Sequence, residues 1–297
     1  MSVNRSLDGE GDEADENTVR VDLTMQNTMR VIAVDWSGAL SGAERKIWLA
    51  EAADGNVVRL ENGRNRIEIA DYLIYEAQKT PEMVIGLDFA FSLPAWFLVQ
   101  RGLTTAQQLW ALADVEAETW LQQCSPPFWG RPGKKCPQGQ LDSYHFRWTD
   151  RAVGPVAGNR PKSVFQIGGA GAVGTGSLRG MSILHRLHSA GFCIWPFDPP
   201  GWPKVVEIYP RLLTGPVIKS AQNQRDAYLR CKYPGLAPWA LDRSVFSEDA
   251  FDAAVSALVM WSSLAQLESL SNPANPLVQK EGIIWQPGAP TLQVFDN

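Results

Sequence analysis

Short apolar runs that end at an acidic residue recur along this chain. Val-Ile-Ala-Val is followed by Asp35, Met-Val-Ile-Gly-Leu is followed by Asp88, and Lys-Val-Val is followed by Glu207. Aliphatic runs of this length are typical of strands that are covered on both faces of a sheet. The pattern therefore predicts interior strands that each carry a carboxylate at or near the carboxyl end.

The residues between these runs predict the remaining elements. Segments 46–53 and 56–63 are joined by Asp54-Gly55, a two-residue hairpin signal, so we expect three antiparallel strands in a meander. Apolar residues at helical spacing, with capping residues and proline stops, predict the helices. The expected helices are 64–80, 104–123, 177–191 and 247–266, and the further expected strands are 82–94, 163–167, 192–198 and 204–213.

A glycine-rich run, 168–176, lies between an expected strand and an expected helix. It holds Gly169, Gly171 and Gly174 in the Gly-x-Gly-x-x-Gly spacing, and Asp198 ends the next expected strand, where dinucleotide folds carry a ribose-binding acid. However, this unit lies in mid-chain without a surrounding series of strand–helix repeats. Tight turns near another active site are the commoner explanation, and nucleotide binding is the alternative.

Composition limits the class of protein. The 297 residues, 45% of them hydrophobic, suffice for one large α/β domain with insertions or for two small domains. The four Cys form no Cys-x-x-Cys pair, and the chain shows no signal peptide and no membrane-spanning run. We therefore expect a cytoplasmic protein without structural zinc or a disulfide framework. With only three His, its chemistry is expected to depend on carboxylates.

Charge is distributed unevenly along the chain. Residues 1–17 hold six acidic side chains and one Arg, and so account for the whole net charge of −5. We expect 1–28 to be a disordered acidic tail and 29–297 to form the folded domain. We also hypothesise that a natural translation start lies near Met29.

The stretch 124–163 differs in kind from the rest of the domain. It contains Pro, Gly and five aromatic residues with little periodicity, and seven Lys or Arg against two acids. We expect a basic, aromatic insertion, which is either a solvated surface loop or a segment that grips phosphates and stacks on bases. The residues selected as phosphate or nucleotide contacts are Arg131, Lys134, Lys135, Lys162, Gly169, Gly171 and Gly174.

A fourth acid, Asp252, lies near the start of the last expected helix, three residues after Asp249. If the three strand ends are neighbours, Asp35, Asp88, Glu207 and Asp252 converge. Such a cluster of like charges is costly unless cations neutralise it. Hard oxygen ligands favour Mg²⁺ or Mn²⁺, and two such ions can activate a water and stabilise the leaving oxygen in phosphodiester cleavage.

The motifs VDWSGA, GLDFAFSLP, KSVFQIGGAGAVGTGSLRGM, WPFD, VVEIYPRL, DAFDAAVSAL and EGIIWQP together resemble the domain-of-unknown-function 429 family. That family consists of predicted nucleases with a ribonuclease H-like fold. The resemblance covers about residues 30–288. It implies an α/β fold with three antiparallel strands followed by parallel strands, flanked by helices, with a large insertion.

The resemblance also implies roles for individual residues. Asp35, Asp88, Glu207 and Asp252 occupy the acidic positions of the family, with Ser37 and Glu281 as supporting groups. Resolvase-type members of the wider fold often carry His three residues before the final Asp, where this chain has Asp249 as a further supporting group. The general base is therefore unassigned.

Three functions follow as hypotheses. The first is a metal-dependent nuclease or phosphodiesterase that uses Mg²⁺ or Mn²⁺ and takes nucleic acid as its partner. The second is a nucleotide-dependent phosphotransferase of the actin-like and sugar-kinase type, with Asp88 as the base and the glycine run around the nucleotide. The third is a non-catalytic module that binds nucleic acid or a nucleotide.

Overall fold

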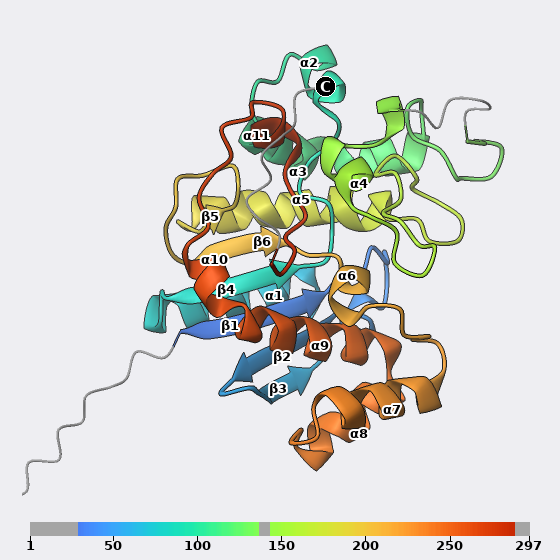
Figure 1. The fold of residues 1–297 in the computed structure, drawn as a ribbon. Helices are drawn as coiled ribbons and strands as arrows, with labels where there is room; N and C mark the ends of the chain where they lie inside the picture. Colours follow the sequence, from blue (N-terminus) through green and yellow to red (C-terminus); the bar gives the residue numbers. More distant parts are fainter. Residues whose placement is uncertain (1–28, 137–142, 289–297) are drawn as a thin grey trace, which may run out of the picture.

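The structure, a computed structural model, describes residues 29–136 and 143–288. The tail expected at 1–28 lies outside these residues. Within them the chain forms one six-stranded sheet with helices on both faces (Figure 1). The strands are β1 (Arg30–Asp35), β2 (Trp48–Ala53), β3 (Asn56–Glu61), β4 (Met83–Leu87), β5 (Cys193–Ile194) and β6 (Lys204–Glu207).

The sheet has the strand order β3-β2-β1-β4-β6-β5. The expected meander is confirmed, because β1, β2 and β3 pair antiparallel and Asp54 and Gly55 make their hairpin with φ of 50° and 74°. Positive φ at both positions is what a two-residue primed turn requires. β4, β6 and β5 extend the sheet from β1 by parallel pairing. The carboxyl ends of β1, β4 and β6 therefore lie at one edge (Figure 1).

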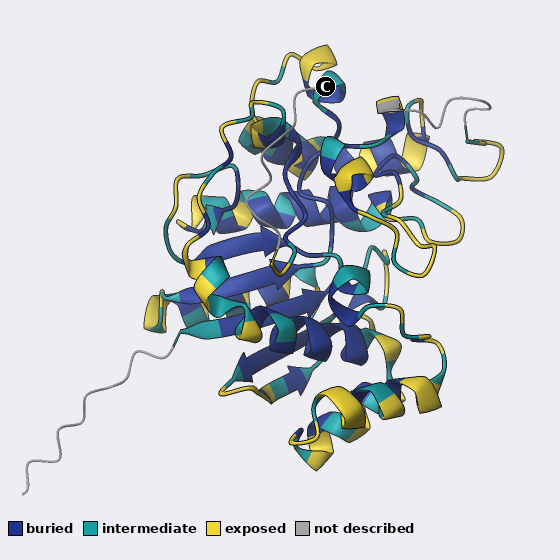
Figure 2. Ribbon diagram, in the orientation of Figure 1, coloured by how far each residue is buried: buried dark blue, intermediate teal, exposed yellow. Residues whose placement is uncertain are grey.

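Two groups of helices cover the sheet. The helices are α1 (Arg66–Lys79), α2 (Ala95–Gln100), α3 (Ala106–Gln123), α4 (Trp148–Ala152), α5 (Gly174–Ser189), α6 (Pro210–Thr214), α7 (Gln222–Lys232), α8 (Pro238–Phe246), α9 (Glu248–Ser262), α10 (Leu264–Glu268) and α11 (Val278–Glu281), with short 3-10 turns at Ala43–Arg45 and Ser143–His145. α1, α3 and α5 pack on one face, and α9 with α6 and α8 packs on the other. Figure 2 shows the sheet and α9 buried, while α7 and α8 expose their outer sides.

Local sequence explains the main helix boundaries. Asn65 and Thr105 form capping boxes that start α1 and α3, and Ser247 caps α9 by accepting a hydrogen bond from the Ala250 N–H. Each cap satisfies backbone donors that the first helical turn leaves free. The small residues of α9, such as Ala253, allow it to lie close to β1 and β2.

The strand expected at 163–167 is wrong, and the one expected at 192–198 is shortened to the two residues of β5. In the first segment only Gln166 forms a bridge, to Trp129, although Phe165 is buried. The Ser163 side chain accepts the Phe165 N–H and favours a turn instead of a strand. The apolar residues of 163–167 are buried, but the segment is not a strand of the sheet.

The structure also contradicts the dinucleotide-binding interpretation, because the strand expected before the glycine run is absent from the described sheet and Asp198 is engaged locally. Asp198 accepts hydrogen bonds from the Ile194 N–H at 2.9 Å and from the Gln107 side chain at 2.9 Å. It therefore stabilises a local turn.

No described helix is long and apolar enough to span a membrane.

Candidate functional site

The alternation of side chains along the strands decides which acids meet. β1 and β4 are parallel and in register, so Asp35 and Asp88 leave adjacent strand ends at the same level. Side chains alternate along a strand, so Asp35 points to the same face of the sheet as Ala33, and Asp88 to the same face as Val84. Ala33 and Val84 pack against the helices around α9 on this face. Asp252 is buried on α9, which crosses this face. The structure thus brings Asp35, Asp88 and Asp252 together.

Glu207 lies on the other side of the sheet, as does Val205 two residues earlier. Its carboxylate makes a two-pronged ion pair with the buried Arg147 guanidinium, at 2.7 and 2.6 Å, and accepts the Phe91 N–H at 2.9 Å. Arg147 also binds Asp150 at 2.8 Å. In this arrangement both Glu207 oxygens are engaged, so this acid is set apart from the other three.

The three grouped carboxylates are strongly desolvated. Burial raises the pKa of Asp35 well above its usual value, and the charges of Asp88, Asp252 and Asp249 raise it further. Burial and the charge of Asp252 raise the pKa of Asp88 to about 8. Burial raises the pKa of Asp252 to about 6, against the opposing effect of Lys219. Like charges and low polarity therefore both oppose full ionisation of the group.

Lys219 is the protein cation nearest to this group. Its ammonium forms an ion pair with Asp252 Oδ2, and both side chains are buried. The Arg225 guanidinium donates to the Lys219 carbonyl and to Val245 O, which holds this turn against α7 and α8. The other Asp252 oxygen, Oδ1, is buried with no hydrogen-bond partner in the described residues. One lysine thus neutralises only part of the negative charge.

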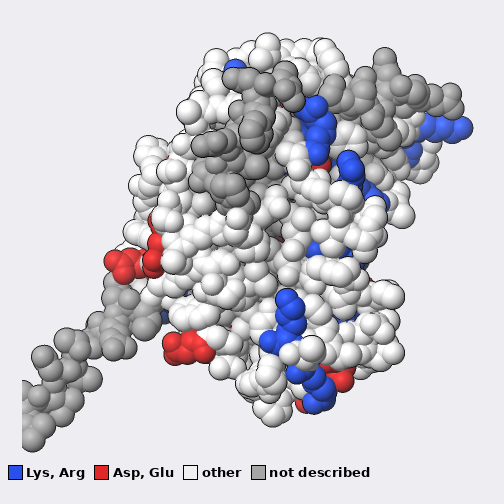
Figure 3. Space-filling view, in the orientation of Figure 1, with Lys and Arg blue, Asp and Glu red and all other residues white. Residues whose placement is uncertain are grey.

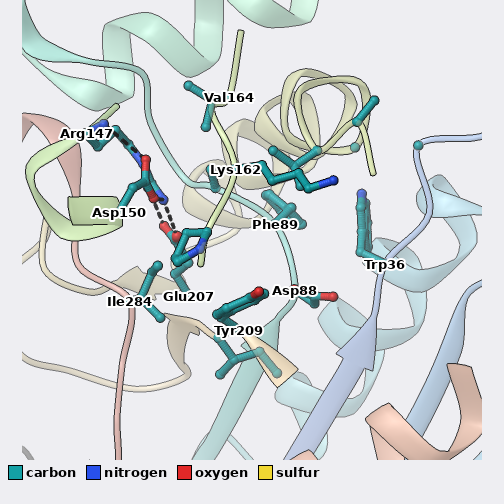
Figure 4. A pocket seen from close by; sticks show the side chains of 17 residues that line it. Trp36, Asp88, Phe89, Arg147, Asp150, Lys162, Val164, Glu207, Tyr209 and Ile284 are labelled. Atoms are coloured by element: carbon teal, nitrogen blue, oxygen red, sulfur yellow. Dashed lines mark hydrogen bonds and ion pairs between the residues drawn. The ribbon is translucent and has the colours of Figure 1, made fainter. Parts of the chain in front are cut away.

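A cavity of about 220 Å³ opens beside Asp88 (Figure 4). Asp88 and Tyr209 lie on one side of it, and the Arg147–Asp150–Glu207 ion pairs lie on another. Asp88 is therefore shared between the carboxylate group and the cavity. Burial and the charge of Asp88 raise the pKa of Tyr209, so its phenol stays protonated at neutral pH.

The opposite wall comes from the loop after β1, the start of α5 and the segment that precedes α5. It includes Trp36, Gly38, Lys162 and Gly176. Gly38 and Gly176 touch through their backbones, since a Cβ on Gly38 would lie 2.5 Å from the Gly176 nitrogen. This contact brings the loop after Asp35 against the first turn of a helix.

The predicted glycines have different roles. Gly169 and Gly171 adopt positive φ of 80° and 70° and turn the chain toward α5. Gly174 begins α5, and a Cβ there would lie 2.1 Å from Val164 O, so close packing explains it. Among the cavity-lining residues Gly176 is the glycine of this run. The run therefore shapes the wall, while residues 172, 173 and 176 supply its surface.

The three supporting residues expected from sequence are placed as follows. Ser37 Oγ accepts the Ala39 N–H at 3.2 Å and shapes the β1 loop. Glu281 accepts the Ala95 and Trp148 N–H groups at 2.6 and 2.5 Å, which anchors the starts of α2 and α4. Asp249 lies half-buried on the first turn of α9, where its charge raises the pKa of Asp35. Of these, Asp249 is the one that acts on the carboxylate group.

The predicted basic residues separate into two groups. Lys162 lines the cavity, whereas Arg131 lines a different hollow, beside Glu118. Lys134 and Lys135 are exposed on the same loop as Arg131. Figure 3 shows Lys and Arg side chains over the region of α4 and its neighbouring loops. Arg131, Lys134 and Lys135 are therefore exposed basic residues that do not line the cavity beside Asp88.

The donor chemistry of Asp35, Asp88 and Asp252 fits a hard divalent cation. The Asp88 N–H donates to Val34 O, but the side-chain carboxylates of Asp35 and Asp88 have no hydrogen bond or ion pair with the described residues. Asp252 Oδ1 is a buried acceptor without a partner among them. Within 29–136 and 143–288, however, no three Asp, Glu, His or Cys side chains are already gathered around one point. A metal would draw these carboxylates together and compete with Lys219 for Asp252.

Sequence reasoning missed several residues that shape this site. Lys219 and Arg147 neutralise acids, and Trp36 and Gly176 line the cavity. Trp36 directly follows Asp35, so alternation along β1 already predicts that it faces the side opposite to Asp35. Asp252 lies 33 residues from Lys219 and Glu207 lies 60 residues from Arg147, and local patterns carry no signal for such contacts.

Comparisons of the chain with protein-family models, curated proteins and solved structures find no match.

Proposed function

We propose that this protein is a metal-dependent phosphodiester hydrolase that acts on nucleic acid. The observation that carries the proposal is the grouping of Asp35, Asp88 and Asp252, which are desolvated and have unpartnered oxygens beside a cavity. Carboxylates in this condition destabilise the metal-free protein, and a divalent cation removes that cost. Glu207 is left out of the proposed ligand set because Arg147 binds both of its oxygens.

The sheet supports assignment to the ribonuclease H-like class. Three antiparallel strands followed by parallel β4 and β6, with acids after β1 and β4 and on the late helix α9, follow the order expected for that fold. We regard 124–163 as the insertion, since it contributes α4 and loops outside the sheet. Its exposed Arg131, Lys134 and Lys135 would contact the nucleic acid backbone.

The residues around the cavity would have different roles in the proposed reaction. Asp35, Asp88 and Asp252 would hold Mg²⁺ or Mn²⁺, which supplies positive charge where the phosphate oxygens become more negative. Asp88 borders the cavity and faces the phosphodiester. The protonated Tyr209 phenol beside it donates a hydrogen bond to a phosphate oxygen. Arg147 fixes Glu207 and keeps that wall rigid.

The size of the cavity argues against the phosphotransferase alternative. Sites for whole small ligands usually measure about 300–1,000 Å³. This cavity of about 220 Å³ is below that range and holds only a short piece of sugar-phosphate backbone, while the rest of a polymer lies outside. A non-catalytic module also has no evident need for unpartnered buried carboxylates.

The test combines metal binding with hydrolysis. Mn²⁺ is titrated calorimetrically into chelator-treated wild type and into Asp35→Asn and Asp88→Asn. The same proteins are assayed on single-stranded DNA, double-stranded DNA and RNA with Mn²⁺. We expect the wild type to bind Mn²⁺ and to cleave at least one polymer, and both variants to lose binding and cleavage while remaining folded.

Asp71→Asn is the matched control, because Asp71 is exposed and pairs only with Arg186 among the described residues. It should bind metal and cleave as the wild type does. Metal-dependent cleavage that persists in Asp35→Asn and Asp88→Asn would overturn the proposal. So would a wild type that binds no metal and cleaves none of the three polymers.

A further inference from the structure

The first turn of α5 presents backbone donors that nothing in the described chain satisfies. The Gly174 N–H donates to Gln166 O at 3.0 Å, and the Ser177 N–H donates to Val173 O at 3.0 Å. The N–H groups of Thr175 and Gly176 between them have no protein acceptor in the described chain, and no side chain caps the helix. Free N–H groups at the start of a 16-residue helix attract anions.

A buried indole points to the same place. Trp36 is only 9% exposed, and its Nε1–H is shielded from solvent without an acceptor in the described residues. The neighbouring ring atom, Cδ1, lies 3.7 Å from the position that a Gly176 Cβ would take. The pyrrole edge of the indole therefore faces the first turn of α5. A buried donor left unsatisfied here is an observation independent of the helix end.

Two arginines bind the carbonyl oxygens of the loop that follows β1. Arg66 donates to the carbonyls of Ser37 and Ala39, both at 2.9 Å, and Arg179 donates to the Gly38 carbonyl. The carbonyl oxygens of the loop are therefore bound to arginine. The acids that line the same cavity are Asp88 and the Arg147-bound pair Asp150 and Glu207.

Lys162 adds a positive charge to this wall. Its ammonium donates to Ala170 O at 3.2 Å and lies against Gly171, where a Cβ would be only 2.1 Å away. The side chain is exposed, so it can swing toward a ligand at little cost. In Figure 4 the Lys162 and Trp36 side chains lie on the same wall of the cavity.

We propose that this wall is a phosphate-binding subsite. It is made by the N–H groups of Thr175 and Gly176, the Trp36 indole N–H and the Lys162 ammonium. The subsite rests on the proposed function and extends it, because it takes the phosphate next to the one that reacts beside Asp88. The substrate therefore carries at least two phosphate groups. Because the indole N–H is buried, phosphate reaches it only when a neighbouring side chain moves. The side chains of Lys162 and Val173 line the cavity and are exposed, so they are free to move.

The test measures binding of inorganic phosphate by titration calorimetry at neutral pH, once with chelator and once with Mg²⁺. Trp36→Phe removes the indole donor and keeps the aromatic packing against Phe89. Gly176→Ala adds a methyl group on the proposed subsite wall, 3.7 Å from Trp36 Cδ1, and its nearest neighbour, Gly38 N, would be at an ordinary contact distance of 3.6 Å. We expect each variant to weaken phosphate binding by about tenfold or more.

Two controls match these substitutions. Trp239→Phe alters an exposed tryptophan of α8, and Gly154→Ala adds a methyl group in open space on an exposed loop. Both should bind phosphate as the wild type does. Absence of binding by the wild type under both conditions would overturn the subsite, and so would Trp36→Phe and Gly176→Ala variants that bind like the controls.

The same proteins separate this inference from the proposed function. Phosphate binding that depends on Trp36 and Gly176, without any metal-dependent cleavage, retains the anion subsite and overturns the hydrolase. Metal-dependent cleavage with phosphate binding unaffected by these variants retains the hydrolase and overturns the subsite. If Trp36→Phe fails to fold, Gly176→Ala alone decides.

Discussion

The Lys219 ammonium is bound to one oxygen of Asp252, while the other oxygen of the same carboxylate is buried without a partner in the described chain. A protein cation therefore lies inside the carboxylate group. Its charge lowers the pKa of Asp35, Asp88 and Asp252 alike, against a larger opposing effect of burial. We infer that Lys219 partly stabilises the site without metal and must yield Asp252 when metal binds.

Lys219→Met tests this competition. Removing one partner of a buried ion pair leaves an uncompensated charge, so we expect the metal-free protein to lose roughly 3–5 kcal/mol of unfolding free energy. Mn²⁺ should then stabilise the variant more than it stabilises the wild type, because no ammonium opposes it. Urea unfolding with and without Mn²⁺ measures both effects.

The control for this substitution is Lys79→Met, at a half-exposed ammonium that pairs with Glu76 at 2.9 Å. Pairs on the surface contribute little, so stability should stay close to that of the wild type and the Mn²⁺ effect should not change. An equal Mn²⁺ effect in Lys219→Met and wild type would show that Lys219 does not compete for the site.

The raised pKa of Asp88 predicts an unusual dependence of the unfolding free energy on pH. Its pKa is about 8 in the folded protein and near its ordinary value of 3.8 when unfolded. Between these values the folded state binds more protons, so the unfolding free energy falls as pH rises from about 4 to 8. Because Asp88 borders the cavity and is partly exposed to solvent, we expect a loss of roughly 1–3 kcal/mol from this group.

Asp88→Asn should remove that loss. The variant is expected to be more stable than the wild type at pH 8 and similar to it near pH 4, in chemical unfolding without metal. A wild type whose stability rises steadily from pH 4 to 8, with no gain in the variant at pH 8, would contradict the assigned ionisation. Asp71→Asn, on the surface, should follow the wild type at every pH.

Much of the fold was predictable because local signals determine it. The Asp54-Gly55 turn, the capping residues Asn65 and Thr105, and Ser247 each act within a few residues along the chain. Segment 163–167 was predicted wrongly for the opposite reason. Its apolar residues are buried by contacts with distant elements, and burial alone does not distinguish a strand from a turn.

The four-acid cluster was predicted without regard to which face each strand presents. The side chains of Asp35 and Asp88 lie on the face of the sheet that α9 covers. Glu207 lies on the opposite face, as Val205 does. Alternation along β6 was visible in the sequence, but the register between β4 and β6 was not. Arg147, which binds Glu207, comes from a segment whose sequence predicts only a basic loop.

Glu207→Gln separates a structural acid from a metal ligand. Glu207 binds Arg147 through both oxygens, so the variant should lose roughly 2–4 kcal/mol of unfolding free energy, with Asp150 retaining part of the pairing. Its Mn²⁺ affinity should stay within about twofold of the wild type. Asp35→Asn is expected to behave oppositely, with Mn²⁺ binding lost and stability kept or increased. Calorimetric titration and urea unfolding of both variants decide, and loss of Mn²⁺ binding in Glu207→Gln would return Glu207 to the ligand set.

Gly38→Ala tests the contact that joins the β1 loop to α5. A Cβ on Gly38 would lie 2.5 Å from the nitrogen and 2.9 Å from the Cα of Gly176, and these backbone atoms cannot rotate away as a side chain does. We expect a loss of roughly 1–3 kcal/mol, because the helix start must move from the loop. Gly176→Ala meets nothing closer than 3.6 Å and gains helix propensity, so its stability should be unchanged or slightly higher. Two substitutions of the same kind, on the two sides of one contact, are thus expected to differ in sign, and equal urea midpoints for them would show that the two backbones do not touch as described.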